Sequence, residues 1–309
     1  MTNFLITGVG GDIGQGMAKI ISMHYKDSRM YGCDIHEEHA GKSFVKKFFL
    51  APLASNEEEY IDFIKSMLIN HKIDILIPTS ESEIEVINKF GILNFSCSVI
   101  LPGNKVINKF IDKYHTNHFL SSIGIKVPWT VKSEESLPSE YPCIFKSRKG
   151  AGSKVLFIVK DSIEANYLAR KYENSIFQKL LLPDNGEITC AVFRSKVNET
   201  RVLQLQRKLV GGSTSWAKTI NNKEVNTMCK HIANEVSLLG SMNVQLRLTN
   251  EGPRIFEINP RFSSTVLMRH LIGFQDLIWT INDILNVKNS YINIPENIEL
   301  ARTHDAVIL

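Results

Sequence analysis

The sequence predicts an α/β fold in two parts: a parallel sheet covered by helices, then an α+β region with antiparallel strands. Two patterns support this prediction. Over the first hundred residues, short continuous apolar runs alternate with segments of helical periodicity, as in parallel sheets that are buried on both faces. After Pro128, apolar runs follow one another across short polar turns, which is typical of antiparallel pairs.

The first part opens with the apolar run Phe4-Leu5-Ile6-Thr7, which ends in glycines and is followed by a helical pattern. The alternation continues to Pro102-Gly103, which interrupts it, and a further helical segment is expected at 105–122. The expected strands are 4–7, 30–34, 74–78 and 98–101, and the expected helices are 13–24, 56–70 and 82–90.

The second part holds most of the expected strands. Residues 243–248 and 254–258 flank the turn Asn250-Glu251-Gly252 and predict a hairpin. The remaining expected strands are 143–146, 155–159, 176–181, 187–193, 201–209 and 213–219, with helices at 162–172 and 226–239. We expect the rest to be helical to about residue 287, with a last strand near 305–309.

Composition excludes several classes of protein. With 43% hydrophobic residues and a net charge of +4 over 309 residues, the chain is neither disordered nor marked by a strong basic excess, and we expect no nucleic-acid partner. No apolar stretch reaches the roughly 18 residues that a membrane span requires. The five cysteines are scattered and form no Cys-x-x-Cys pair, which predicts a reduced, cytoplasmic protein rather than a disulfide or zinc protein.

A glycine-rich loop, Gly8 to Gly14, joins the first strand to the first helix. Such a loop can bind a phosphate at the helix N-terminus, and Asp34 at the end of the second strand could then bind a ribose. Tyr167 and Lys171 match the Tyr-x-x-x-Lys pattern of short-chain dehydrogenases. These residues keep open an NAD(P)-dependent sugar-modifying oxidoreductase or epimerase. The alternative is that the glycines only make a tight turn.

Two hairpins carry the other candidate site. In the first, a basic, glycine-rich loop from Ser147 to Lys154 follows Lys146 and could fold over a polyphosphate. In the second, strand alternation places Glu257 and Asn259 on one face, with Gln245 opposite them. Oxygen ligands of this kind suit Mg²⁺. Arg261 follows two residues later and could bind an anionic oxygen.

These hairpins resemble the ATP-grasp superfamily. Glu257-Ile-Asn259-Pro-Arg261-Phe-Ser263-Ser264 and Asn243-Val-Gln245 are similar to motifs of one unit of the carbamoyl-phosphate synthetase large subunit and of single-unit carboxylate–amine ligases. The resemblance implies a Rossmann-like pre-ATP-grasp domain at 1–104. It implies an ATP-grasp domain of two α+β subdomains at 105–309, with a lid subdomain at about 128–177.

The resemblance also implies roles for individual residues. Lys113 and Lys146 would contact the ATP phosphates, Gly150, Gly152 and Ser153 would belong to the lid loop, and Arg261 would stabilise an acyl phosphate. Gln178, Lys179, Leu180 and Leu181 would form the adenine-binding hinge strand, and Glu187 would bind the ribose. Gln245, Glu257 and Asn259 would hold two Mg²⁺ ions, or Mn²⁺ in their place.

The activity that the resemblance implies is ATP-dependent amide formation from a small-molecule carboxylate and an amine, through an acyl phosphate. A homodimer is compatible with it. Two departures from the synthetase pattern are Leu209, in place of a histidine, and Ser264, in place of a second arginine. We consider Trp216, Arg269 and His270 as candidates for the substrate pocket. A catalytically inactive ATP-binding regulatory protein is a further alternative.

Overall fold

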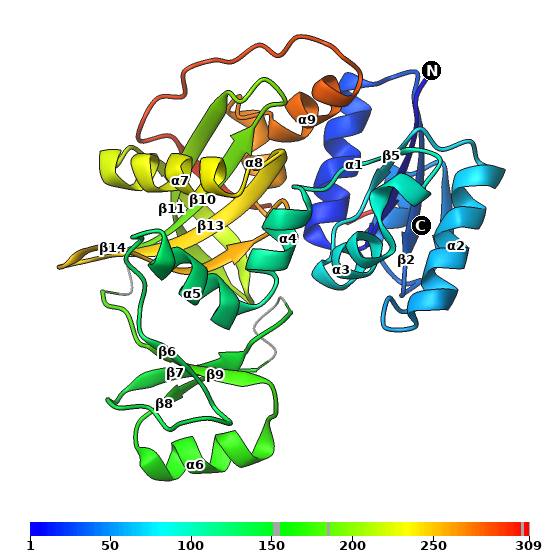
Figure 1. Ribbon diagram of the computed structural model, residues 1–309. Coiled ribbons are helices and arrows are strands. Elements are labelled where there is room, and N and C mark those ends of the chain that lie inside the picture. The colour runs from blue at the N-terminus through cyan, green and yellow to red at the C-terminus, as the bar shows by residue number, and fades with distance from the viewer. Residues whose placement is uncertain (151–154, 184–185, 304–305, 309) are drawn as a thin grey trace.

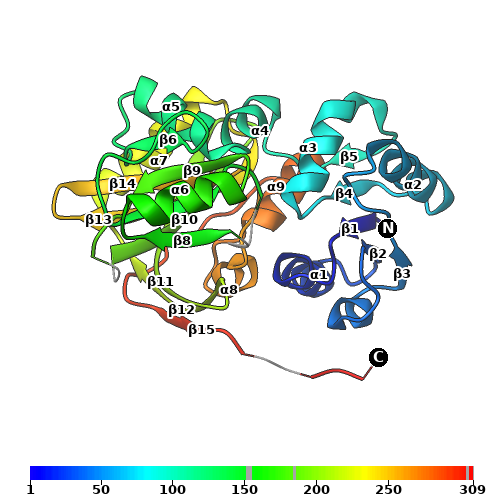
Figure 2. The same ribbon diagram turned by 90° about the horizontal axis from the view of Figure 1, so that it is seen from below.

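The computed structural model describes residues 1–150, 155–183, 186–303 and 306–308. It contains three sheets, and Figures 1 and 2 show the N-terminal sheet to one side of the other two. The mixed α/β class with a parallel N-terminal sheet and antiparallel sheets after it is the predicted one. None of the described helices is long and apolar enough to cross a bilayer.

The N-terminal sheet is parallel in all its pairs and has the strand order β3-β2-β1-β4-β5. Its central strand is buried on both faces, since Phe4 and Ile6 pack with α1 while Leu5 packs with α2. The strands are β1 (Asn3–Thr7), β2 (Arg29–Asp34), β3 (Lys47–Leu50), β4 (Ile75–Ile77) and β5 (Ser98–Val99), and the helices are α1 (Asp12–His24), η1 (Ala40–Phe44), α2 (Glu57–Asn70), α3 (Glu81–Phe90) and η2 (Ile92–Asn94).

The smallest sheet is antiparallel, with the order β6-β9-β7-β8, and helix α6 packs on one face of it. Phe145 of β7 lies opposite Phe177 of β9, and both rings are fully buried. The elements are β6 (Thr130–Lys132), β7 (Cys143–Ser147), β8 (Leu156–Val159), α6 (Ser162–Lys171) and β9 (Ser175–Lys179).

The third sheet is antiparallel, with the order β14-β13-β10-β11-β12-β15. On β10, Ile188 and Cys190 join the core under α4, α5 and α7, while Ala191 and Phe193 join a second core with residues of α8 and α9. The strands are β10 (Glu187–Arg194), β11 (Thr200–Val210), β12 (Ser213–Ile220), β13 (Gly240–Thr249), β14 (Gly252–Asn259) and β15 (Glu299–Ala301), and the helices are α4 (Asn104–Phe110), α5 (Lys113–Ser122), α7 (Lys223–Glu235), α8 (Val266–Leu271) and α9 (Asp276–Ile284).

Several element boundaries differ from those expected. The segment 105–122 is two helices rather than one, because Asp112 caps a new helix by accepting hydrogen bonds from the backbone N–H groups of Tyr114 and His115. Helix α7 ends at Glu235, and Ser237 then takes a left-handed conformation with φ of +52°. Strands β3 and β6 were not expected.

The C-terminal strand was also placed wrongly. Residues 306–308 form no strand, and Asp305 and Leu309 lie outside the described residues. Strand β15 instead lies at Glu299–Ala301, where it pairs with β12 at the edge of the six-stranded sheet. The segment expected to be helical to about residue 287 is two helices, α8 and α9, separated by Gly273, whose φ is +97°.

Candidate active site

The candidate site lies on the face of the six-stranded sheet that is turned toward the four-stranded sheet (Figure 1). Lys146 on β7 joins the two sheets, because its ammonium donates a hydrogen bond to the Phe256 carbonyl of β14 at 3.3 Å. On β10, Glu187 and Thr189 alternate with the core residues Ile188 and Cys190, so that they face the opposite side. This end of the sheet therefore presents polar side chains to the smaller sheet.

Two neighbouring strands, β13 and β14, carry the predicted metal ligands. Gln245 of β13 lies opposite Glu257 of β14, as expected, and Asn243 lies opposite Asn259. The Asn259 side-chain N–H donates a hydrogen bond to the Glu257 Oε1 at 2.9 Å. The side-chain carbonyl oxygen of Asn259 takes no part in that bond. The register of this hairpin therefore places the three side chains at neighbouring positions, as the strand alternation predicted.

Lys113 approaches the same carboxylate from α5. Because Asp112 is the N-cap, Lys113 is the first residue of this helix, and its backbone N–H donates to the Arg148 carbonyl at 2.9 Å. Its ammonium lies 4.0 Å from the Glu257 Oε1 and donates to the Gly150 carbonyl at 2.9 Å. The break in the expected helix therefore positions one of the two predicted phosphate-binding lysines.

The charges on this face shift one another's pKa values. Burial lowers the pKa of Lys146 from 10.5 to about 8; Glu257 opposes that effect and Lys113 adds to it. Burial alone would raise the pKa of Glu257, but the attraction of Lys113 and Lys146 outweighs it, so that this pKa lies below its ordinary value. The site thus holds an ionised carboxylate and a lysine that is charged at neutral pH at an energetic cost.

Gln245 and Glu187 share an arginine that sequence reasoning missed. Arg207 of β11 donates from Nη2 to the Gln245 Oε1 at 2.7 Å, and from Nη2 and Nε to the Glu187 Oε1 at 2.7 and 2.9 Å. Arg247 donates to the other Glu187 oxygen at 2.9 Å. The carboxylate predicted to bind a ribose therefore has two arginine partners.

The predicted hinge consists of the end of β9, an inner strand of the four-stranded sheet, and the loop that follows it. Gln178 is buried and donates to the Thr130 hydroxyl at 3.0 Å. The Lys179 N–H donates to the Trp129 carbonyl at 3.0 Å, and the Leu181 carbonyl accepts from Arg247 at 2.5 Å. Leu180 lies between Lys179 and Leu181 in this predicted hinge.

The predicted lid loop is described only in part. Gly150 has φ of +88° and accepts the Lys113 hydrogen bond, whereas Gly152 and Ser153 lie outside the described residues. Lys149 forms a 2.6 Å ion pair with Glu85 of α3. The basic hairpin thus contacts both the site lysine Lys113 and the N-terminal part of the chain.

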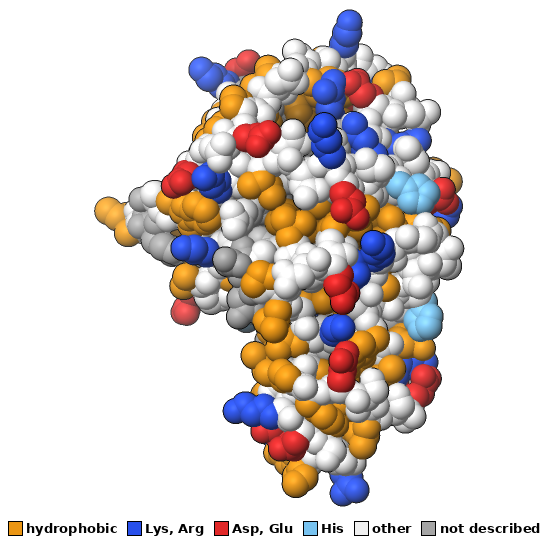
Figure 3. Space-filling model, turned by 90° about the vertical axis from the view of Figure 1, so that its left-hand side faces the viewer, with side chains coloured by type: hydrophobic (Ala, Val, Ile, Leu, Met, Phe, Trp, Pro, Cys, Tyr) orange, Lys and Arg blue, Asp and Glu red, His pale blue; other side chains and the backbone are white. Residues whose placement is uncertain are grey.

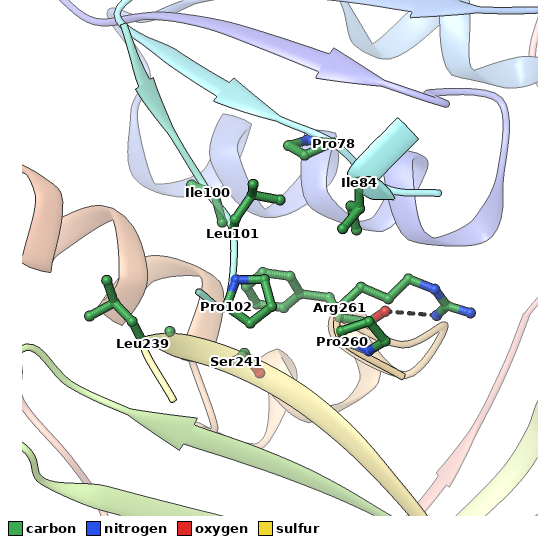
Figure 4. Close-up of a pocket in the computed structure, with 11 residues that line it drawn as sticks. Pro78, Ile84, Ile100, Leu101, Pro102, Leu239, Ser241, Pro260 and Arg261 are labelled. Carbon is green, nitrogen blue, oxygen red and sulfur yellow. Dashed lines mark hydrogen bonds between the residues drawn. The ribbon is translucent and has the colours of Figure 1, made fainter. Parts of the chain in front are cut away.

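Arg261 also has a partner from the N-terminal part. Its guanidinium lies 3.0 Å from the Glu81 carboxylate at the start of α3, and both side chains are about nine-tenths buried. Figure 4 shows Pro260 and Arg261 beside Pro78 and Ile84, with Leu101 and Pro102 lining the same small pocket. Sequence reasoning missed Glu81, because nothing in its local pattern indicates a partner 180 positions away.

Two of the guessed pocket residues are structural. Arg269 is 1% exposed and forms an ion pair with Asp276 at 2.6 Å, while it also donates to the Ser263 hydroxyl at 2.9 Å. It therefore supports the loop after β14 rather than lining a pocket. His270 is buried and its Nε2 lies 3.0 Å from that of His24 on α1, at the contact between the two parts of the chain.

The N-terminal glycine loop is satisfied by its own surroundings. The Asp34 carboxylate accepts hydrogen bonds from the Gly10 N–H at 2.8 Å and from the His36 N–H at 3.2 Å, so that both of its oxygens have partners within the chain. A Cβ at Gly14 would lie 2.4 Å from the Gly8 carbonyl oxygen. Tyr167 and Lys171 lie on α6, against the four-stranded sheet and not beside this loop. The geometry favours the tight-turn interpretation.

On the face shown in Figure 3, acidic and basic side chains are interspersed. Within the part of the chain that the structure describes, no group of three or more His, Cys, Asp or Glu side chains could hold a metal ion. Any cation at the candidate site would therefore depend on amide oxygens as well as Glu257.

Comparison with solved structures identifies the fold. The N5-carboxyaminoimidazole synthetase of Staphylococcus aureus, solved with ADP, has a TM-score of 0.75 at 16% identity over 94% of this chain and 79% of that one. The L-amino acid ligase of Bacillus licheniformis has a TM-score of 0.66 at 15% identity over 88% of this chain and 70% of that one.

A biotin carboxylase domain from Hydrogenobacter thermophilus, solved with MgADP and bicarbonate, has a TM-score of 0.73 at 12% identity over 96% of this chain and 73% of that one. At such identities the similarity concerns the fold. No curated protein matches the sequence. The model of the ATP-grasp domain matches residues 110–265, which is half of the chain and includes Lys113, Lys146, Glu257 and Arg261. The chain belongs to the ATP-grasp family.

Proposed function

We propose that this protein is an ATP-dependent ligase that joins a small-molecule carboxylate to an amine through an acyl phosphate. The observation that carries the proposal is the meeting of Lys113, Lys146 and Glu257 between two sheets, in a chain of the ATP-grasp family. The fold neighbours, whose names include two synthetases or ligases and a carboxylase, support the same reaction class.

The reaction has two steps. A carboxylate oxygen of the substrate attacks the γ-phosphorus of ATP, and ADP leaves. The amine then attacks the carbonyl carbon of the acyl phosphate, so that a C–N bond forms and phosphate departs with the amine proton. The first step is a phosphoryl transfer, in which positioning and charge neutralisation account for most of the catalysis. No protein nucleophile is required.

The residues of this chain supply the positive charge. Lys113 and Lys146 would contact the phosphates, and a bound triphosphate would offset the burial that lowers the pKa of Lys146. Arg261 would contact the acyl phosphate. Its guanidinium would then either keep Glu81 as a second partner or release it. We assign adenine contact to the hinge from Gln178 to Leu181. The lid loop would exclude water, which otherwise hydrolyses an acyl phosphate.

The donor set fits a divalent cation. Glu257 is ionised, and the Asn259 carbonyl oxygen remains on the same face, which are the hard oxygen ligands that Mg²⁺ prefers. When bound, such a cation would neutralise charge on the β- and γ-phosphates. The small number of carboxylates is in keeping with Mg²⁺ sites, where substrate phosphates complete the coordination.

The test is substrate-stimulated release of ADP in the presence of Mg²⁺, with mixtures of carboxylates and amines as substrates. We expect Glu257→Gln to abolish the stimulated release. Glu251→Gln is the matched control, because Glu251 is an exposed residue at the tip of the same hairpin. Equal rates for Glu257→Gln and the wild type would show that the site assignment is wrong.

The alternatives make different predictions in simple binding experiments. An NAD(P)-dependent enzyme would bind NADH in preference to ATP, which a titration followed by cofactor fluorescence detects. An inactive ATP-binding protein would bind ATP but release no ADP with any substrate mixture. The engagement of Asp34 by Gly10 argues against the first alternative.

A further inference from the structure

We propose that this site takes a single divalent cation and that the Arg207 guanidinium occupies the place of a second one. The proposal rests on the proposed function, because it concerns the charge that accompanies ATP in the same site. It differs from the two-ion arrangement that the sequence resemblance implies.

A second cation would need Gln245 as a ligand. Its carbonyl oxygen accepts a hydrogen bond from the Arg207 Nη2 at 2.7 Å. The identity of this atom is fixed by chemistry, because a guanidinium only donates and an amide nitrogen could not accept from it. A divalent cation on the same oxygen would lie next to a fixed positive charge.

Arg207 is held in place by Glu187. Two hydrogen bonds, from Nε at 2.9 Å and from Nη2 at 2.7 Å, tie it to the Glu187 Oε1. Its side chain is 7% exposed, and Glu187 is held in turn by Arg247 at 2.9 Å. Charge-assisted bonds of this kind are stronger than those between neutral groups. Arg207 is therefore a built part of the site rather than a surface side chain.

The protein oxygens that remain at the site can coordinate one cation. The Asn259 nitrogen donates to Glu257 Oε1 at 2.9 Å, which leaves the Asn259 carbonyl oxygen and the Glu257 Oε2 for a cation. Two protein oxygens together with phosphate oxygens and water complete one octahedral Mg²⁺ site. They do not supply a second set without Gln245.

The fixed charges around the site also favour one cation over two. With one cation, Lys113, Lys146 and Arg207 stand around the site as fixed positive charges, and Glu257 partners two of them. A guanidinium placed between Glu187 and Gln245 supplies part of the charge that a second ion would bring. Unlike an ion, it does not have to be bound and released in each turnover.

The experiment counts Mn²⁺ by electron paramagnetic resonance, in the presence of the non-hydrolysable analogue AMP-PNP. We expect the wild type to bind one Mn²⁺ per bound nucleotide, with an uncoupled six-line spectrum. Arg207→Met removes the charge and frees Gln245, and we expect a second Mn²⁺ to bind at least about tenfold more tightly than to the wild type. Its spectrum should show coupling between two nearby ions.

Two further variants separate the charge of Arg207 from the fold. Arg207→Lys keeps a cation and should still bind one Mn²⁺, while Arg207→Met combined with Gln245→Met should return to one. Two coupled Mn²⁺ ions in the wild type would overturn the inference even if no variant folds, and so would a single Mn²⁺ in a folded Arg207→Met variant. Failure of AMP-PNP to bind at all would overturn the proposed function as well.

Discussion

Replacement of Lys146 by Met should stabilise the protein and remove its nucleotide binding. A buried lysine whose pKa falls from 10.5 to about 8 is charged at pH 7 in both the folded and the unfolded state, but its charged form is disfavoured in the fold. At about 1.4 kcal/mol per pH unit, this difference corresponds to about 3 kcal/mol. Met has a similar shape and carries no charge, so that Lys146→Met should raise the free energy of unfolding by about this amount at pH 7.

The pH dependence of the free energy of unfolding tests the direction of this pKa shift independently. The folded pKa lies below the unfolded one, so between about pH 8 and 10.5 the wild type folds with a neutral Lys146 while its unfolded chain still binds the proton. Wild-type stability from this group therefore rises with pH in that window. The advantage of Lys146→Met should be full below pH 8 and should vanish near pH 10.5.

The assay is urea unfolding of both proteins across this pH range, with and without AMP-PNP. Lys160→Met is the control, because Lys160 is an exposed lysine that follows β8 in the same subdomain, and its loss should change stability by less than about 0.5 kcal/mol. AMP-PNP should stabilise the wild type but not Lys146→Met. A Lys146→Met variant that is less stable than the wild type at pH 7, or an advantage independent of pH, would refute the reasoning.

Three further predictions concern other parts of the molecule. Glu257→Gln should lower Mg²⁺-dependent ADP formation by at least about 100-fold, measured by a coupled assay, because it removes the only carboxylate among the predicted metal ligands. Glu81→Gln should cost about 3 kcal/mol in urea unfolding, since it leaves the buried Arg261 guanidinium without its partner, and Glu81→Gln combined with Arg261→Met should recover most of the loss. Gly14→Ala should lower the melting temperature, because its Cβ would lie 2.4 Å from a backbone oxygen, whereas Gly11→Ala, with its nearest contact at 3.6 Å, should be tolerated.

The parts of the fold that were predictable from sequence are those with a local pattern. Continuous apolar runs indicated the parallel sheet, and alternation in 254–258 indicated which side chains of the second hairpin share a face. The missed strands β3 and β6 have four and three residues, too few for a period to be visible. The break between α4 and α5 did have a local signal, because Asp112 is a favourable N-cap residue. The prediction of one continuous helix at 105–122 did not take it into account.

The parts of the site that were not predictable depend on contacts between distant segments. Arg207 meets Gln245 only because β10 lies between β11 and β13, and that strand order has no signature in either segment. Glu81 meets Arg261 only when the N-terminal part docks against the loop after β14. Both contacts are pairs of polar groups buried by tertiary structure, so that a charge in a strand or at a helix start gives no indication of its partner.

In the proposed reaction, ATP phosphorylates a substrate carboxylate before an amine attacks. The most direct measurement uses a carboxylate labelled with ¹⁸O, in the substrate mixture that stimulates ADP release, and follows the label by ³¹P NMR. We expect one ¹⁸O atom to appear in the inorganic phosphate for each amide formed, because the acyl phosphate breaks at its carbonyl carbon. Phosphate without the label, or AMP and pyrophosphate in place of ADP and phosphate, would contradict the account.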